Sequence, residues 1–261
     1  MALHVVEVSR HPELAFVPSA DLYDEARQGL QEGGKRHLQE FVKHHTHGEI
    51  QPDQVVHLGS APDSILAFAQ KQRTDVIVMG THGRRGYDRL MLGSVTDRVM
   101  RRAPCPVLVV CNPPTDLTAA HKDHGRVHHL SRILFCTDFS QNSELALSYA
   151  ISATAEYDAE LTLLHVLEDV PSAAKTEETI AAARAQLDKL VPPEARQTVR
   201  IKTAVRIGKP YQQIIQLVVE TQTDMVAMGV RGRGALDLAV FGSTTYRVMQ
   251  LGPCPVLAVH V

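Results

Sequence analysis

Apolar and polar positions in the second half of the chain follow spacings that predict strands and helices in turn. Short apolar runs are expected to form strands at 132–136, 160–167, 225–228 and 255–261, and alternation of apolar and polar residues predicts a further strand at 199–205. Apolar residues at helical spacing predict helices over 144–156, 176–190, 209–221 and about 243–250. Strands and helices that alternate in this order favour an α/β fold, in which helices cover both faces of a parallel sheet.

The chain also repeats itself without gaps. Residues 74–110 (TDVIVMGTHGRRGYDRLMLGSVTDRVMRRAPCPVLVV) align with residues 223–259 (TDMVAMGVRGRGALDLAVFGSTTYRVMQLGPCPVLAV) at a constant offset of 149. The offset pairs Asp75 with Asp224 and brings two Pro-Cys-Pro triplets into register. Chance does not give so many matches, so the chain is a duplication of one unit. We expect a first domain at 1–111, a linker at 112–130 and a second domain at 131–261.

Each unit carries the motif G-x2-G-x9-G-S directly after a strand and into a helix. Glycines let the backbone adopt positive φ and let a ligand approach closely, and the N–H groups of such a loop suit a phosphate. The serine begins a helix, where free N–H groups and the helix dipole favour an anion. Two copies in one structural context favour phosphate binding over plain turns, chiefly in the second unit. The motif residues are Gly80, Gly83, Gly93 and Ser94, and then Gly229, Gly232, Gly242 and Ser243.

Together with the segment RILFCTDFS at 132–140 and the two Pro-Cys-Pro-Val-Leu strands, these motifs resemble the universal stress protein family over nearly the whole chain. The resemblance implies a flavodoxin-like fold, similar to that of adenine-nucleotide hydrolases, whose five parallel strands have the order 3-2-1-4-5. It also implies that ATP, or ADP or AMP, binds at the carboxyl ends of the strands, where open α/β sheets hold ligands. We expect Mg²⁺ to accompany a triphosphate.

The resemblance assigns roles to individual residues of the second unit. Cys136, Thr137 and Asp138 would contact the adenosine half of the nucleotide, and the main chain of Val166 would meet the adenine edge. For Asp138, a role as a helix cap or turn residue is the alternative. Ribose and phosphates would be held by Met228, Gly229, Gly232, Gly242, Ser243 and Thr244, with Arg231 beside the phosphate charge. A weaker second set is Gly80, Gly83, Gly93, Ser94 and Val95, because the first unit has no counterpart of Asp138.

The first unit lacks the beginning of the strand and helix order that the second unit has. Leu3–Val6 (LHVV) resembles Leu164–Leu167 (LHVL), the second strand of the second unit, so the first strand and first helix have no counterpart. In the family's strand order the absent strand is the central one, and its loss would leave strand edges unpaired. Three explanations stay open: the protein starts further upstream, a partner chain donates a strand, or this half is degenerate. We favour the first.

Charge and composition bear on the kinds of partner, compartment and metal site that can be expected. A formal net charge of -2 provides no basic field for nucleic acid, and no apolar run approaches the ~20 residues that cross a bilayer. The first residues lack the features of a secretory signal, so we expect a cytoplasmic protein. The histidine clusters lack a carboxylate or cysteine that would complete a metal site, and none is predicted. The cysteines form no CxxC pair and are expected to be small buried residues: Cys105, Cys111, Cys136 and Cys254.

The resemblance implies a nucleotide-binding regulatory protein of the stress response. We expect no catalytic residue, because no positioned base or water-orienting residue is evident for phosphoryl transfer. A slow ATPase and an interaction module without nucleotide are the alternatives. The final strands 106–110 and 255–259 are expected to be edge strands, and the resemblance implies that they pair with each other inside the tandem chain. Further homodimerisation and an unidentified regulatory protein partner are also expected.

Overall fold

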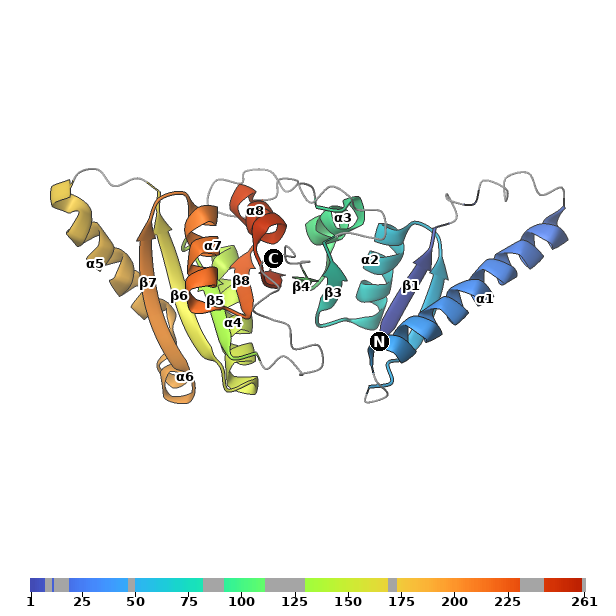
Figure 1. The fold of residues 1–261 in the computed structure, drawn as a ribbon, viewed down its shortest axis with the longest axis horizontal. Coiled ribbons are helices and arrows are strands. Elements are labelled where there is room, and N and C mark those ends of the chain that lie inside the picture. Colours follow the sequence, from blue (N-terminus) through green and yellow to red (C-terminus); the bar gives the residue numbers. More distant parts are fainter. Residues whose placement is uncertain are drawn as a thin grey trace. The chain divides into compact units, whose positions relative to one another are not determined.

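The computed structural model describes residues 1–7, 11, 19–46, 50–81, 92–110, 130–168, 173–230 and 242–259. Its elements, labelled in Figure 1, are β1 (Ala2–Val6), α1 (Ala20–His45), β2 (Gln54–Leu58), α2 (Ala61–Gln72), β3 (Ile77–Gly80), α3 (Ser94–Arg102), β4 (Val107–Val110), β5 (Arg132–Cys136), α4 (Gln141–Glu156), β6 (Glu160–Leu167), α5 (Ala173–Leu190), α6 (Pro193–Thr198), β7 (Arg200–Ile207), α7 (Pro210–Thr221), β8 (Met225–Gly229), α8 (Ser243–Leu251) and β9 (Val256–Val259). Within the described residues, no helix combines the length and apolar character needed to cross a bilayer.

The elements predicted for the second repeat are all present, with ends that differ by a few residues. Helix α6 was not predicted, because the Pro192-Pro193 pair was interpreted as the end of a helix. In the structure Pro193 lies in the first turn of α6, where proline is tolerated because that turn has no N–H partner to lose.

Two compact units make up the chain, and they do not follow the sequence repeat. One unit contains Met1–Thr74 and Arg102–Pro104, and the other contains Asp75–Arg101 and Cys105–Val261. The last strands and loop of the first repeat therefore belong to the same unit as the second repeat. The predicted linker at 112–130 falls almost entirely outside the described residues, and the domain limits stay a prediction.

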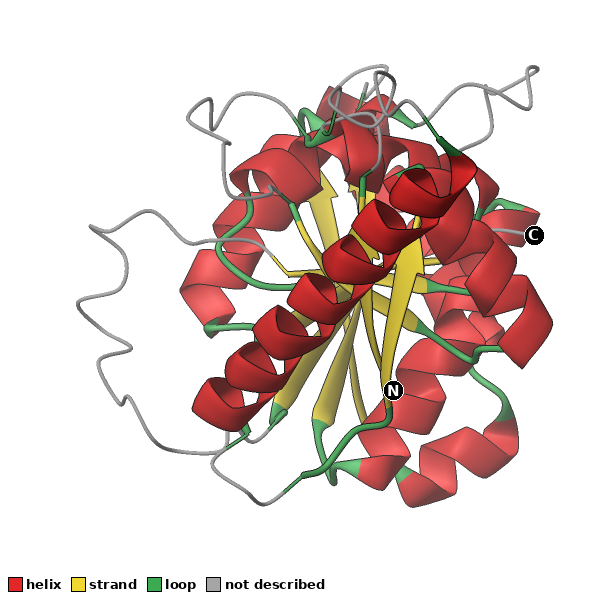
Figure 2. Cartoon of the chain, turned by 90° about the vertical axis from the view of Figure 1, so that its right-hand side faces the viewer, coloured by secondary structure: helices red, strands yellow, loops and turns green. Residues whose placement is uncertain are grey.

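The smaller unit is built on a two-stranded parallel sheet. Strand β1 pairs with β2 along its whole length, and the long helix α1 packs across both strands (Figure 2). Leu38 and Val42 of α1 are buried against Val56 of β2. A Cβ added at Gly34 would lie 2.9 Å from methyl carbons of both Val56 and Val6, so glycine is what lets the helix approach this closely.

The larger unit contains a seven-stranded sheet of order β3-β4-β9-β8-β5-β6-β7. Strands β9, β8, β5, β6 and β7 are mutually parallel. Counted along the second repeat, their spatial order reads 3-2-1-4-5 from β7 to β9, as expected. Both faces of the sheet are covered at β5: Phe135 packs in the cluster that includes residues of α4 and α5, and Leu134, on the other face, is 0% exposed. Burial on both faces explains why β5 is a continuous apolar run.

Strands β4 and β9 join the two repeats inside this sheet. They pair antiparallel, with Leu108 opposite Leu257 and Val107 opposite Ala258. Leu108 and Leu257 are repeat counterparts at the offset of 149, so the contact has the form of a two-fold interface in which a position meets its own copy. The expected pairing inside the tandem chain is therefore present. The prediction that both are edge strands was wrong, since β3 and β7 end the strand order.

Asp224 fixes the start of the central strand β5. Its Oδ2 accepts hydrogen bonds from the N–H groups of Ser131 at 2.9 Å and Arg132 at 2.8 Å. Its own N–H donates to the Arg132 carbonyl at 2.9 Å. One side chain thereby ties the beginning of β8 to the beginning of β5. Asp75 is its counterpart ahead of β3.

We expect Asp224→Ala to lower the free energy of unfolding by about 1 kcal/mol, because two strand amides lose their acceptor. Urea titration followed by circular dichroism measures the change. Asp75→Ala is the matched control and is expected to have almost no effect, since Asp75 is exposed. Equal losses in the two variants would contradict the assignment of the cap to Asp224.

Candidate functional site

The carboxyl ends of three neighbouring parallel strands bring most of the predicted residues together. Cys136, at the end of β5, pairs in register with Met228 of β8 and with Leu164 of β6. The Thr137 N–H donates to the Leu164 carbonyl at 3.0 Å. Val166 lies further along β6 toward the same end. This edge is where ligands bind in open α/β sheets.

The turn after β5 is held by its own side chains. Thr137 Oγ1 lies 2.8 Å from Ser143 Oγ and accepts the Phe139 N–H at 2.9 Å. Asp138 Oδ1 accepts the Ser140 N–H at 3.1 Å. Ser140 is the N-cap of α4. The buried Thr137 side chain is thus engaged inside the turn, and the turn role weighed for Asp138 is present, with its side chain partly exposed.

Two residues in contact at this turn, Phe139 of the turn itself and His165 of β6, were not among the predicted site residues. Phe139 has a φ of 60°, a left-handed conformation that costs energy for a bulky side chain. Its ring packs on that of His165, with 4.4 Å between centroids. His165 Nδ1 lies 2.8 Å from the Thr137 carbonyl oxygen, so that nitrogen carries the proton it donates. The only sequence signal for this contact was the repetition of His165 at His4, interpreted as a core or strand-end histidine.

Cys136 contributes a buried, neutral thiol. The side chain is 6% exposed, and burial, with a smaller effect of Cys254, raises its pKa far above the ordinary value of 9.0. The charged form is disfavoured because a thiolate would lose its hydration there. Cys136 therefore provides apolar contact and backbone groups at this edge, and no negative charge.

The end of β8 is locked to the start of α8. Thr245 Oγ1 donates to the Gly229 carbonyl at 2.9 Å, and the Gly242 N–H donates to the Val230 carbonyl at 3.0 Å. Gly242 is the N-cap of α8 and provides no side-chain cap. At the start of this helix Ser243 is exposed and Thr244 is half-buried. N–H groups at an uncapped helix start, with the positive end of the dipole, form a site suited to an anion.

Gly229 serves the packing of this edge. A Cβ added there would lie 3.0 Å from Asn142 C and Ser143 N, at the start of α4. The absence of a side chain lets β8 and α4 approach closely. The sequence-based explanation for this glycine, a place in the phosphate loop, did not include this packing and stays a prediction.

The first repeat has the same framework around its glycine motif. Thr96 Oγ1 donates to the Gly80 carbonyl at 2.8 Å, and the Gly93 N–H donates to the Thr81 carbonyl at 2.8 Å. The start of α3 differs from that of α8 in charge, because Asp97 lies in its first turn. Asp97 forms a bidentate pair with an arginine of the same helix.

Tyr246 of α8 replaces that aspartate in the second repeat, and its hydroxyl accepts the Leu92 N–H at 3.2 Å. A carboxylate in the first helical turn disfavours an anion at α3 relative to α8. The first-repeat candidates Gly80, Gly93, Ser94 and Val95 surround the end of β3, which β4 and β9 separate from β8 in the strand order. They do not join the second-repeat set.

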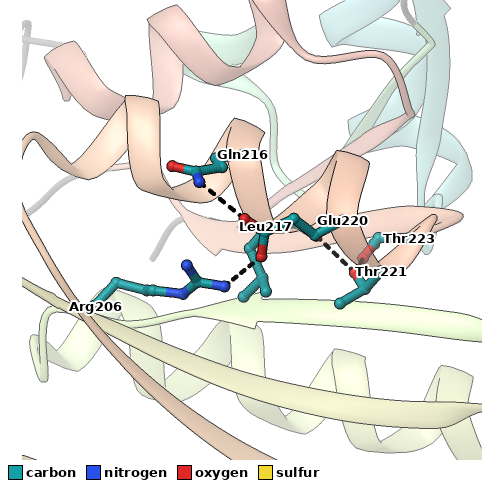
Figure 3. Close-up of polar contacts among 6 residues, drawn as sticks. All are labelled: Arg206, Gln216, Leu217, Glu220, Thr221 and Thr223. Carbon is teal, nitrogen blue, oxygen red and sulfur yellow. Dashed lines mark hydrogen bonds and ion pairs between the residues drawn. The ribbon is translucent and has the colours of Figure 1, made fainter.

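Arg206, next to this edge, forms an ion pair within the protein. Arg206 of β7 is the register partner of Val166, and it forms an ion pair with Glu220 of α7 (Figure 3). Gln216 Nε2 also donates to Glu220 Oε1 at 2.8 Å. Arg206 therefore fixes α7 against β7 and is not a candidate for phosphate. The predicted loop residues Gly83, Arg231 and Gly232 lie outside the described residues, and their roles stay predictions.

Comparison with known proteins gives a consistent result. A family model described as the universal stress protein family matches residues 1–110 and 129–260. A universal stress protein of Methanocaldococcus jannaschii is 38% identical over 112 residues, which cover 43% of this chain and 64% of that protein. One of Mycobacterium tuberculosis is 28% identical over 193 residues, which cover 70% of this chain and 61% of that protein. The chain thus spans less than two thirds of the length of either relative.

A solved structure agrees with the fold. The crystal structure of a universal stress protein from Archaeoglobus fulgidus has a TM-score of 0.66 to this chain and is 22% identical in sequence. The match covers 98% of this chain and 85% of that chain. At this level of sequence identity, the similarity is evidence for a shared fold and not for a shared function.

We expect Gly229→Ala to destabilise the protein by roughly 1–3 kcal/mol, because the new methyl group meets the backbone of α4 and cannot move aside. Thermal unfolding measures the loss. Gly33→Ala is the control: nothing lies within 4 Å of its added Cβ, and alanine favours a helix over glycine. A Gly229→Ala variant as stable as the wild type would contradict the close approach of β8 to α4.

We expect Cys136 to resist iodoacetamide in the native protein at pH 9, where an exposed thiol with the ordinary pKa of 9.0 is half ionised. Burial keeps this thiol both protonated and inaccessible. Mass spectrometry of tryptic peptides, with and without urea, locates the label. Rapid native labelling of Cys136 would show that this edge of the sheet opens.

Proposed function

We propose that this chain, which belongs to the universal stress protein family, binds an adenine nucleotide at the carboxyl edge of its second repeat. The supporting observation is the uncapped start of α8, which Thr245 holds against the end of β8. Cys136 and Met228 lie in register on neighbouring strands, so the Asp138 turn ends next to the same edge. The phosphates would meet the start of α8 and the adenosine half would meet the turn.

Residues at this edge fit the two halves of such a ligand. Main-chain N–H groups at Ser243 and Thr244 suit phosphate oxygens. Asp138, held in its turn, is a hydrogen-bond acceptor suited to ribose hydroxyls, and the β6 backbone at Val166 can pair with the adenine edge. ATP is the nucleotide we propose, with ADP and AMP as weaker ligands that make fewer phosphate contacts.

The proposal assigns nucleotide binding to the second repeat and not to the first. Both repeats have a glycine motif, but α3 carries Asp97 in its first turn and α8 has no acidic residue there. The difference in charge weakens phosphate binding at α3.

The cellular role we propose is regulatory. Bound nucleotide would change the protein's affinity for a protein partner in the cytoplasm during stress, which requires that nucleotide binds the two conformational states unequally. Further dimerisation belongs to the same proposal. Mg²⁺ would arrive with the triphosphate. Within the described residues, no cluster of three or more His, Cys, Asp or Glu is placed to hold a metal ion.

We propose binding without catalysis, because the one candidate base, Asp138, is held in the turn after β5 and is assigned to binding the nucleotide. The alternative, slow hydrolysis, is tested on the same preparation by following ADP release from ATP. Turnover that persists in the wild type and disappears in Ser243→Asp would establish an enzyme at this site and replace the binding-only proposal.

The experiment that tests binding begins with purified protein. It is denatured by heat and the supernatant is analysed by chromatography for released adenine nucleotide, after which nucleotide-free protein is titrated with fluorescent ATP. We expect Ser243→Asp to weaken ATP binding at least about tenfold, because a carboxylate at the helix start repels phosphate. The same charge favours the helix itself, so folding is preserved.

Ser94→Asp, at the equivalent position of the first repeat, is the matched control and is expected to leave the affinity for ATP unchanged. GTP serves as the control for base selectivity. Wild-type affinity in Ser243→Asp, or equal losses in both serine variants, would refute the placement of the site at α8.

A further inference from the structure

Asp138, assigned above to the ribose of the nucleotide, lies between two residues that contact the same histidine. The carbonyl oxygen of Thr137 lies 2.8 Å from Nδ1 of His165, which donates the hydrogen bond. The ring of Phe139 packs on the His165 ring, with 4.4 Å between centroids. The residue before Asp138 and the residue after it are therefore both held by one imidazole of β6.

The hydrogen bond from His165 orients the peptide group that leads into Asp138. The Thr137 carbonyl and the Asp138 N–H belong to one planar unit, so a bond to that oxygen restrains the whole plane. The N–H of Thr137 donates to the Leu164 carbonyl, also on β6, at 3.0 Å. Both main-chain groups of Thr137 are thus bonded to the neighbouring strand, and Asp138 starts from a restrained backbone.

Phe139 has a backbone conformation that its ring contacts account for. A φ of 60° is a rare outlier for a bulky residue, and such strain persists where surrounding contacts impose it. The half-buried ring packs against the core cluster on the side of α4 and α5. His165 lies on the same face of the sheet, because Leu163 of that cluster is two residues before it on β6. His165 and the core together hold the strained residue in place.

The carboxylate of Asp138 is in turn oriented by the turn itself. Its Oδ1 accepts the Ser140 N–H at 3.1 Å, which sets the side chain relative to the backbone of the turn. His165 sets that backbone relative to β6. The position of the carboxylate relative to Val166, the next residue of β6, therefore depends on His165.

We propose that His165 is a positioning residue of the nucleotide site, which places Asp138 at the distance from the Val166 main chain that an adenosine requires. This inference rests on the proposed function, in which Val166 meets adenine and Asp138 meets the ribose hydroxyls. One residue of β6 thereby joins the part of the site for the base to the part for the sugar. Its contacts do not include the start of α8, so its effect concerns the ribose and not the phosphates.

Calorimetric titration of the full chain with ATP and with dideoxy-ATP, which lacks both ribose hydroxyls, tests this role. We expect His165→Phe, which retains a ring and loses the N–H donor, to weaken ATP binding about tenfold. The affinity for dideoxy-ATP should not change, because that ligand makes no hydroxyl contact with Asp138. In an Asp138→Ala background, His165→Phe should have no further effect on either ligand.

His165→Asn separates the hydrogen bond from the ring contact. The side-chain amide nitrogen of asparagine can take the place of Nδ1 and donate to the Thr137 carbonyl. We expect this variant to bind ATP within about threefold of the wild type. His4→Phe is the matched control, because His4 is a strand histidine of the other compact unit, and it should leave the affinity for ATP unchanged.

A measurement without nucleotide tests the contact itself. Long-range proton–nitrogen NMR spectra at mildly alkaline pH identify the ring nitrogen that carries the proton, and we expect Nδ1 of His165. A proton on Nε2 would overturn the inference whatever the protein binds.

Two results with nucleotide would also overturn it: an unchanged affinity for ATP in His165→Phe, and equal losses for ATP and dideoxy-ATP. In both cases the wild type binds ATP, so the proposed function stands. A wild-type protein that binds no ATP would instead refute the proposed function, and this role of His165 with it.

Discussion

The hydrogen-bonded central position of β5 is the constraint on which the larger unit depends. A strand inside a parallel sheet must have its backbone groups paired on both edges, because unpaired groups are costly once buried. Strand β5 pairs with β6 on one edge and with β8 on the other, so it also satisfies one edge of each of those strands. Its residue Phe135 is fully buried between the helical layers. The turn that follows β5 carries Asp138, so the element that completes the core also positions the candidate site. In the first repeat nothing described plays this part, and β3 is left at an edge.

Much of this fold could be predicted from the sequence. The apolar runs of β5 and β8 mark buried parallel strands, and the constant offset between the repeats aligns each motif with its copy. The antiparallel pairing of β4 with β9 was also anticipated, although their internal place in the sheet was not. What the repeat could not reveal is that β3 and β4 belong to the same compact unit as the second repeat, because that depends on long-range pairing and not on local pattern.

The placement of the candidate-site residues in the fold was predictable to a similar degree. Cys136, Met228 and Gly229 were expected at one edge of the sheet and lie there, because parallel strands all end at the same side. The contact between Phe139 and His165 was not predicted, since it depends on a left-handed turn that no local pattern indicates for a phenylalanine. The packing role of Gly229 was also missed, because a motif glycine and a glycine that admits a helix backbone look the same in sequence.

The starts of α3 and α8 have the same backbone geometry but differ in charge. In each, a threonine of the helix binds the last carbonyl of the preceding strand, Thr96 for Gly80 and Thr245 for Gly229. These bonds fix the backbone and leave other, partly exposed positions of the helix start free to vary. An aspartate occupies one of these positions in α3 and a tyrosine occupies it in α8, so the anion-attracting character of the helix start differs although its geometry is the same.

Leu108 opposite Leu257 has an evolutionary consequence. When two identical chains meet across a two-fold axis, every substitution at the contact appears on both sides, so a harmful change is doubled and a compensating partner cannot arise separately. Joining the copies in one polypeptide removes that coupling. Each leucine can then mutate against a fixed neighbour, and one half can lose an ancestral property while the other retains it. The antiparallel pair β4–β9 is thus a contact whose two sides can change independently of each other.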